Sequence, residues 1–399
     1  MRSKLTVLMV TAFVDMLGLI IVYPLLPFYA TRLGASAAMV GALVAAFSVA
    51  QLVSAPAWGW MSDRYGRRPA ILFGLLVSAV AYVIFAFAGT LWLLFLSRLI
   101  QGLGGGTIGV VQAYVADISE QKDRAKALGW LSAVTSLGAV VGPAIGSILV
   151  RVGGHTAPGI GSATLCVLVS IFAWRFLRES RTDTQQFEAM HAKGPGGAHA
   201  IRSVIVHPNL PASRLIWIYA IAIGAFYGTA PLLPLILADR LGATDENIGY
   251  FIMYLGGMGV IVRTGILSRM IERLGEARLA RLGLVLLAAG LAMVSMITSY
   301  PTMLISLTLM PMGTAFIFPC VTAMLSRVVP NKQRGLYMGV QHTFGGVSRV
   351  AFPLIAGYGM DVLGQGIPFV FAGLMVVATL LLTTSMESYI AAPVTAVDR

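Results

Sequence analysis

Residues 59–69 read Gly59-Trp60-Met61-Ser62-Asp63-Arg64-Tyr65-Gly66-Arg67-Arg68-Pro69, and they separate two long apolar segments, 39–61 and 69–88. A transmembrane helix needs about 20 mostly apolar residues, so both segments are long enough to cross a bilayer. The polar stretch between them is short and must turn tightly at the membrane surface, where water solvates its charged side chains. These residues therefore predict a helical hairpin in a membrane.

The same pattern of long apolar segments extends over the whole chain. Twelve segments are candidates for transmembrane helices: 5–30, 39–61, 69–88, 91–116, 126–149, 158–177, 214–238, 247–268, 279–298, 302–325, 336–359 and 366–386. Of the 399 residues, 57% are apolar and 11% are charged, whereas soluble domains are about 45–50% apolar and about 25% charged. This composition excludes a soluble protein. The five His and two Cys, with no Cys-x-x-Cys, predict neither a metal site nor a redox centre.

The Lys and Arg residues lie mostly on one side of the predicted membrane. With the N-terminus in the cytoplasm, 22 of the 28 fall in cytoplasmic segments and 3 in outer loops. This distribution follows the positive-inside rule and predicts that both termini are cytoplasmic. It also accounts for the net charge of +12 without a nucleic-acid partner. We expect an integral membrane protein of a bacterial inner (plasma) membrane, with the lipid bilayer as its surroundings.

The sequence consists of two similar halves. Residues 178–213 are polar and contain Gly194-Pro195-Gly196-Gly197, which predicts a flexible cytoplasmic linker between residues 1–177 and 214–399. Four sets of residues recur in order with shifts of 206–210: Pro24-Leu25-Leu26-Pro27 as Pro231-Leu232-Leu233-Pro234, Arg32-Leu33-Gly34-Ala35 as Arg240-Leu241-Gly242-Ala243, Gly59 and Ser62 as Gly265 and Ser268, and Arg124, Gly129 and Pro143 as Arg334, Gly339 and Pro353. Such parallel repeats are an architecture of secondary transporters, with the solute site between the halves.

The hairpin 59–69 resembles the signature loop of the major facilitator superfamily, an all-α membrane fold of twelve transmembrane helices in two pseudo-symmetric halves. The residues that carry the resemblance are Gly59, Asp63, Arg64, Gly66, Arg67 and Arg68. The resemblance implies that Asp63 rests against the start of the eleventh helix. It also implies that Arg67 pairs with Asp117, at the inner end of the fourth helix, to lock a closed inner gate. The second half has Arg269 where Asp63 would be, which predicts an asymmetric gate.

Three further spans resemble those of proton-coupled exporters. The fourth span carries Arg98-x-x-Gln101-Gly102, similar to a motif in which the Arg assists proton transfer. The fifth span carries Gly138, Gly142, Pro143 and Gly146, and resembles the antiporter motif of the drug–proton branch, except that Ser147 occupies its last position. The first span resembles those of tetracycline and multidrug exporters, although the ninth span lacks the acidic residue of tetracycline exporters.

Asp15 is the only acidic residue deep inside a predicted span. It lies ten residues after Leu5, which is about 15 Å into a hydrocarbon core of about 30 Å. An acid at that depth costs about 2.5–3.5 kcal/mol on insertion scales. Burial disfavours the carboxylate and a nearby cation favours it, so an acid moved between such settings can take up and release a proton. We predict that Asp15 is the proton-coupling residue, with Arg98 reaching toward its level. Ala222 is the repeat equivalent of Asp15, so the second half has no matching acid.

The sequence predicts a proton-coupled antiporter that exports small amphipathic compounds by alternating access and functions as a monomer. Candidate residues lining the substrate cavity are Gln51, Gln101, Gln112, Tyr114, Phe226, Tyr227, Gln341, Phe344 and Arg349. No Gly-x-x-x-x-Gly-Lys-Ser/Thr motif is present, so we expect no cofactor, with a proton gradient as the energy source. One alternative is a facilitator-family exporter of a specific metabolite, sugar or lipid-like solute. A membrane enzyme would need clustered His, Asp or Cys near a surface, and a channel would favour polar pore-lining repeats.

Overall fold

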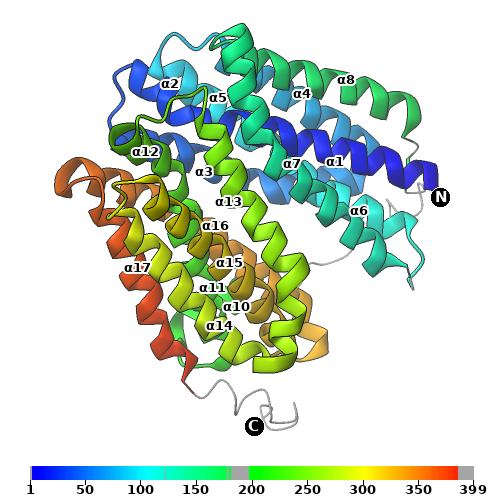
Figure 1. Ribbon diagram of the computed structural model, residues 1–399. Coiled ribbons are helices and arrows are strands. Elements are labelled where there is room, and N and C mark those ends of the chain that lie inside the picture. The colour runs from blue at the N-terminus through cyan, green and yellow to red at the C-terminus, as the bar shows by residue number, and fades with distance from the viewer. Residues whose placement is uncertain (1, 122, 178, 181–196, 385–399) are drawn as a thin grey trace. The chain divides into compact units, whose positions relative to one another are not determined.

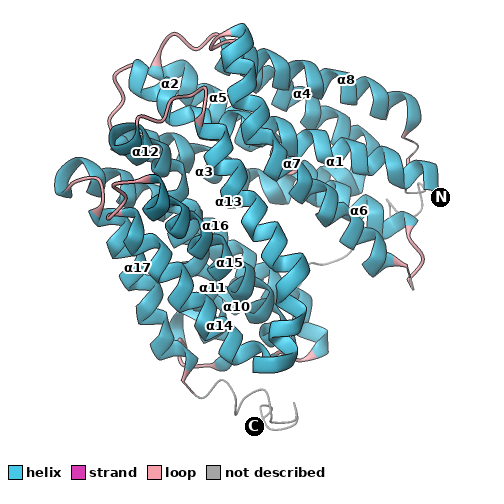
Figure 2. Cartoon of the chain, in the orientation of Figure 1, coloured by secondary structure: helices cyan, strands magenta, loops and turns pink. Residues whose placement is uncertain are grey.

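The computed structural model describes residues 2–121, 123–177, 179–180 and 197–384, and these residues form helices and short connections without strands (Figure 1, Figure 2). Most of the predicted linker, residues 178 and 181–196, lies outside the described residues. Residues Gly197–Val206 form helix α10. The structure therefore differs from the flexible chain that we expected in this part of the linker.

The chain divides into two compact units. Unit 1 consists of Met1–Ala35, Leu43–Lys193 and Ala243–Met253, and unit 2 of Ser36–Ala42, Gly194–Gly242 and Tyr254–Arg399. Each unit thus holds one half of the sequence together with a short segment from the other half. The segment that joins unit 1 contains the start of α13, and the segment that joins unit 2 contains the start of α3.

Unit 1 is a bundle in which α1 packs along α7 and α8, while α4 packs along α5 and α8. Glycine and capping residues set the ends of its helices. Gly66 has a φ of 101° between α3 and α4, a conformation that glycine adopts readily. Thr90 caps α5 by accepting a hydrogen bond from the Leu93 N–H. The elements are α1 (Arg2–Val22), η1 (Tyr23–Leu25), α2 (Leu26–Arg32), α3 (Ala37–Tyr65) after its first residues, α4 (Arg67–Ala86), α5 (Leu91–Gly104), α6 (Thr107–Ile118), α7 (Arg124–Gly153) and α8 (Ala157–Phe176).

Unit 2 is a second bundle, in which α14 packs along α15 and α17, and α11 packs along α16. Its elements are α10 (Gly197–Val206), α11 (Pro211–Thr229), η2 (Ala230–Leu232), α12 (Leu233–Leu241), α13 (Ile248–Ile261) after its first residues, η3 (Val262–Ile266), α14 (Leu267–Val294), α15 (Tyr300–Val328), η4 (Asn331–Gln333), α16 (Arg334–Leu363), α17 (Ile367–Ala378) and η5 (Thr379–Thr383). The element η3 is a short π-helix. Gly275, with a φ of 74°, interrupts α14.

The described residues of all twelve predicted segments are mostly helical. Within the described residues, nine helical stretches are long and apolar enough to cross a membrane. One of them, Ile248–Val294, is divided at Gly275 and supplies two of the predicted segments, while α16 and Ile367–Thr383 supply the last two. The fourth span, predicted as one helix over 91–116, is broken after Gly104 and restarts at Thr107.

Candidate functional site

The hairpin predicted to face the cytoplasm carries an ion-pair network around Arg67. Its Nη1 lies 2.9 Å from Asp63 Oδ1 and its Nε lies 3.1 Å from Asp117 Oδ2. Nη1 also donates a hydrogen bond to Ser62 Oγ. The Arg67 side chain is only 7% exposed, so these partners offset most of the cost of burying its charge. The pair with Asp117 is the contact that the resemblance implied, while its part in gating stays a prediction.

Glu179 caps the start of α4, a contact that the sequence did not reveal. Its Oε1 accepts from the Arg67 N–H at 2.9 Å and its Oε2 from the Arg68 N–H at 3.0 Å. A carboxylate at this position satisfies N–H groups that have no partner within the helix and complements the helix dipole. A Cβ at Gly66 would overlap the Glu179 carboxylate and displace this cap, and the φ of 101° at Gly66 favours glycine.

The equivalent turn in the second half is at Gly275, which has a positive φ like Gly66. Counting back three residues from each turn pairs Asp63 with Glu272, not with Arg269. The expected register was wrong because the chain from Gly265 to Gly275 is three residues longer than the chain from Gly59 to Gly66. The π-helix at Val262–Ile266 lies at the start of this longer stretch.

Arg64 and Gly59 of the signature hairpin take no part in the ion-pair network around Arg67 described above. The Arg64 guanidinium lies over the Trp60 and Tyr65 rings, 5.2 and 5.6 Å from their centroids. A Cβ at Gly59 would meet no atom within 4 Å. In this conformation, packing does not explain the glycine at position 59.

Asp15 lies in the middle of α1, and its Oδ2 accepts a 2.8 Å hydrogen bond from Thr107 Oγ1. The sequence identified the acid but not this partner. Arg98 does not pair with it: the guanidinium lies over the Phe85 ring, 5.2 Å from the centroid. Among the described residues, Arg98 Nε and Nη2 have no hydrogen-bond partner, although the residue is only 2% exposed. Unit 1 therefore holds a deep acid with one donor and a separate buried cation.

The antiporter-motif glycines of α7 face α1. A Cβ at Gly138 would lie 2.9 Å from Phe13 O, and one at Gly146 would overlap Ile21 O. At Gly142 the nearest atom, a side-chain carbon of Ile20, would be 3.2 Å away. The glycines therefore allow close contact with the helix that carries Asp15, while their part in antiport stays a prediction.

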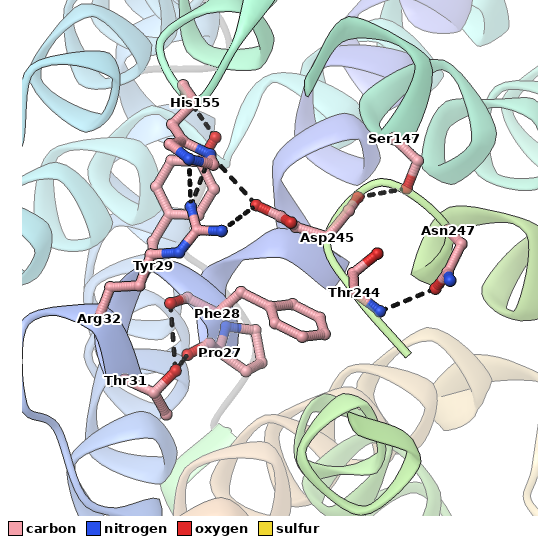
Figure 3. Close-up of polar contacts among 10 residues, drawn as sticks. All are labelled: Pro27, Phe28, Tyr29, Thr31, Arg32, Ser147, His155, Thr244, Asp245 and Asn247. Atoms are coloured by element: carbon pink, nitrogen blue, oxygen red, sulfur yellow. Dashed lines mark hydrogen bonds and ion pairs between the residues drawn. The ribbon is translucent and has the colours of Figure 1, made fainter. Parts of the chain in front are cut away.

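The last residues of the motif contact the start of α13. Ser147 Oγ donates to Asp245 O at 2.7 Å (Figure 3) and accepts from the Gly249 N–H at 2.9 Å. A Cβ at Gly249 would overlap Pro143 O. Ser147, where this chain departs from the motif, thus joins α7 to a segment from the second half of the sequence.

A polar cluster surrounds Asp245 beside this contact, as Figure 3 shows. Asp245 Oδ2 lies 2.9 Å from Arg32 Nη2 and 3.2 Å from His155 Nδ1, and the Asp245 side chain is 6% exposed. Tyr29 OH donates to the backbone carbonyl of His155. From the sequence, Asp245 was one of many acids near span ends, so the cluster was not predicted.

The predicted cavity residues have mixed surroundings. Gln51 Nε2 donates to Gly105 O at 3.2 Å, and Gln101 Nε2 donates to Tyr82 OH at 2.9 Å. In this conformation the buried candidates offer little or no surface to a solute: Gln101, Tyr114, Phe226 and Gln341. Gln112 and Tyr227 are exposed, and Gln51, Phe344 and Arg349 are intermediate. Whether any of them contacts a solute stays a prediction.

Comparisons with a family model and with known proteins agree on the family of this chain. The Major Facilitator Superfamily model matches residues 8–270 and 218–393. Multidrug resistance protein 1 of Bacillus subtilis (strain 168) is 30% identical over 387 residues, covering 96% of each chain. The class B tetracycline resistance protein of Escherichia coli is 26% identical over 360 residues, covering 89% of this chain and 88% of that protein.

A solved structure shares the fold. The crystal structure of a POT family transporter in complex with 5-aminolevulinic acid has a TM-score of 0.78 and 13% identity, and covers 96% of each chain. At this identity the likeness concerns the fold alone. Together with the apolar helices, the family match identifies an integral membrane protein whose relatives are transporters and drug-resistance proteins. The chain belongs to the major facilitator superfamily.

Proposed function

We propose that the protein is a proton-coupled secondary active transporter that exports small amphipathic compounds by alternating access. Its similarity to a multidrug resistance protein extends over 96% of both chains, which supports small-molecule drugs as substrates. The single observation that carries the proton coupling is Asp15, a carboxyl group deep in α1 with one hydroxyl donor. A proton gradient supplies the energy, and no cofactor is needed.

In this proposal Asp15 is the group that binds a proton in one state and releases it when substrate binds. A carboxylate in the middle of a span is costly, so proton uptake stabilises it when no other charge compensates. Arg98 is a buried cation with two unpartnered nitrogens among the described residues. A rearrangement that brings such a cation near Asp15 would favour proton release.

The two polar networks of unit 1 are the proposed gate elements. The Arg67 network, with Asp63 and Asp117, lies at the end predicted to be cytoplasmic, and the Arg32–Asp245 pair lies at the opposite end of the α1–α2 span. Breaking ion pairs at one end while others form at the opposite end is a common device for switching between two states. We propose that the transporter is a monomer in a bacterial plasma membrane with both termini in the cytoplasm.

The test is reconstitution of the purified protein in liposomes with an imposed pH gradient. A panel of lipophilic cations, quinolones, tetracyclines, sugars and lipid-like solutes is offered, and substrate movement and internal pH are followed together. The proposal predicts that several chemically unrelated amphipathic compounds move uphill and that each dissipates the pH gradient.

Two other results decide against parts of the proposal. Movement of one solute class only, such as a sugar, would favour the specific exporter and exclude broad drug export. Uphill movement that persists after the pH gradient is collapsed would exclude proton coupling. An uncoupler added to the same liposomes provides that control.

A further inference from the structure

The break in the fourth span, between α5 and α6, is stabilised by its neighbour α3. Three side chains of α3 donate hydrogen bonds to backbone carbonyls around the break. Ser54 Oγ donates to Gly102 O at 3.3 Å, Trp58 Nε1 to Leu103 O at 2.5 Å, and Gln51 Nε2 to Gly105 O at 3.2 Å. Non-helical backbone at membrane depth is tolerated only where protein or water satisfies its polar groups. The three donors lie on one face of α3, three and four residues apart.

Thr107 is the first residue after the break, and the break frees its hydroxyl. In an unbroken helix a Thr hydroxyl commonly donates to the carbonyl four residues earlier. For Thr107 that carbonyl belongs to Leu103, which already accepts from Trp58 Nε1. The Thr107 hydroxyl donates instead to Asp15 Oδ2 at 2.8 Å.

Gly74 on α4 leaves the space that Thr107 needs. A Cβ at Gly74 would lie closer than 3.0 Å to Thr107 Cγ2, a separation that real Cβ atoms essentially never show. The Thr107 side chain is 2% exposed. Its methyl group is therefore held against α4 while its hydroxyl points to α1, which fixes the orientation of the donor.

We propose that Thr107 is the positioning residue of Asp15: its hydroxyl sets the pH at which this carboxyl group binds its proton, and the break in the fourth span holds that hydroxyl in place. The inference rests on the proposed role of Asp15 in proton coupling. A hydrogen bond donated to a carboxylate favours its charged form, so loss of the donor shifts proton binding to higher pH.

Other titratable groups around Asp15 come from the helices packed near it. The titratable residues in the spans packed around α1 include Tyr82 on α4, Arg98 on α5 and Cys166 on α8. On α6 the titratable groups are Tyr114 and Asp117, and on α7 they are Arg124, Lys126 and Arg151 at its ends. On α8 Arg175 lies near the end, and on α1 itself Arg2 and Lys4 lie at the start. The side-chain hydrogen bond that Asp15 accepts comes from Thr107.

The experiment measures protonation of Asp15 without requiring transport. Dicyclohexylcarbodiimide adds to protonated carboxyl groups in apolar surroundings, and peptide mass spectrometry counts the adduct at Asp15. The pH of half-maximal labelling is compared in the wild type, Thr107→Val, Thr107→Ser and Thr11→Val. Thr11 is a matched control: it is buried on the same helix as Asp15, but its hydroxyl donates to Val7 O at 2.8 Å.

We expect Thr107→Val to raise this pH by about one to two units, because the variant removes a hydrogen bond that favours the charged carboxylate. Thr11→Val should match the wild type, and Thr107→Ser should lie closer to the wild type than Thr107→Val, because serine keeps the hydroxyl but loses the methyl contact with α4. The proposal is overturned if Thr107→Val leaves the profile unchanged, or if Thr11→Val shifts it equally.

A pair of variants tests the role of Gly74. Gly74→Ala should displace Thr107 and raise the labelling pH, and adding Thr107→Ser should lower it again to the value of Thr107→Ser alone, because serine lacks the methyl group that the new Cβ meets. A double variant no better than Gly74→Ala would contradict the proposal. These outcomes are independent of export: if Asp15→Asn exports normally, the coupling role fails while the labelling result still decides whether Thr107 controls the acid.

Discussion

The two halves place an ion pair at equivalent positions but with opposite polarity. In unit 1, Arg67 directly after the turn glycine pairs with Asp117 at 3.1 Å. In unit 2, Glu276 directly after the turn glycine pairs with Arg327 at 2.6 Å. The shifts between these residues are 209 and 210, in line with the rest of the repeat. The repeat therefore preserves the position of the ion pair while reversing its charges.

Helix packing is reversed in the same way. In unit 1 the small residues, including Gly142, lie on α7 and face larger residues of α1. In unit 2 the small residue Gly224 lies on α11, and a Cβ there would overlap the Phe352 ring of α16. Gly142 and Phe352 are repeat equivalents by a shift of 210. Either arrangement lets the two helices approach, because one glycine per contact is sufficient.

Some structural features are common to both halves, and one is specific to the first half. Both need a tight turn, an ion pair beside it and a close helix contact. Unit 1 alone adds an acid: Asp15 has a hydroxyl donor, whereas its equivalent Ala222 is fully buried and apolar. We therefore assign proton coupling to the first half.

The largest effect is expected from Gly142→Leu, which tests the close contact between α1 and α7. A leucine would force α7 away from α1, and overpacking of this kind costs about 1–3 kcal/mol. Export should stop, or the protein should conduct protons without substrate. Drug accumulation in cells and pH decay in proteoliposomes measure the two outcomes.

The matched control is Gly129→Leu on the same helix, because Gly129 is exposed and a Cβ there would meet no atom within 4 Å. We expect this variant to retain export and proton tightness. Normal export and normal tightness in Gly142→Leu would show that close α1–α7 packing is dispensable.

A smaller effect is expected from Asp63→Asn, which tests whether the Arg67 network controls the predicted cytoplasmic end. The lost pair is partly exposed, so its contribution is about 1 kcal/mol or less. The fraction of molecules open to the cytoplasm should rise by up to about fivefold. Spin labels at the exposed residues Tyr65 and Arg273, with Cys166 and Cys320 replaced, report the distance distribution.

Glu272→Gln is the control in the equivalent loop, since Glu272 stands three residues before Gly275 as Asp63 stands before Gly66. It should leave the distribution unchanged. Equal shifts in both variants would mean that the two loops act alike, so that the effect is not specific to the Arg67 network.

The smallest effect concerns the reversed ion pair itself. Arg327→Glu should lower thermal stability slightly, by about 1 kcal/mol or less, because Arg327 is 55% exposed. Adding Glu276→Arg restores opposite charges with the polarity of the first half, so the double variant should recover the wild-type melting temperature. A double variant less stable than the single one would show that the polarity, and not only the pairing, is fixed.

The sequence predicted the fold because span length, cation placement and the internal repeat are properties of many residues at once. It also placed Asp15 inside a span and matched Arg67 with Asp117 through a known motif. It gave the wrong register for the second loop, where Arg269 was matched to Asp63. Three additional residues before Gly275 changed the register, and short repeats do not locate such insertions.

The partners of the site residues were harder to predict because they depend on tertiary contacts. Glu179 is 112 residues from the Arg67 backbone that it caps, and Asp245 is in a different half from Arg32. The Thr107–Asp15 bond depends on a helix break. The break falls at Gly104-Gly105-Gly106, and three consecutive glycines indicate a weak point in a helix.

The central claim is that Asp15 is the group that exchanges a proton for substrate. The most direct measurement is proton release by purified protein in weakly buffered detergent solution on addition of a transported compound, with substrate binding followed in parallel. We expect release by the wild type and by Ala222→Ser, and binding without release by Asp15→Asn. Undiminished proton release by Asp15→Asn would contradict it.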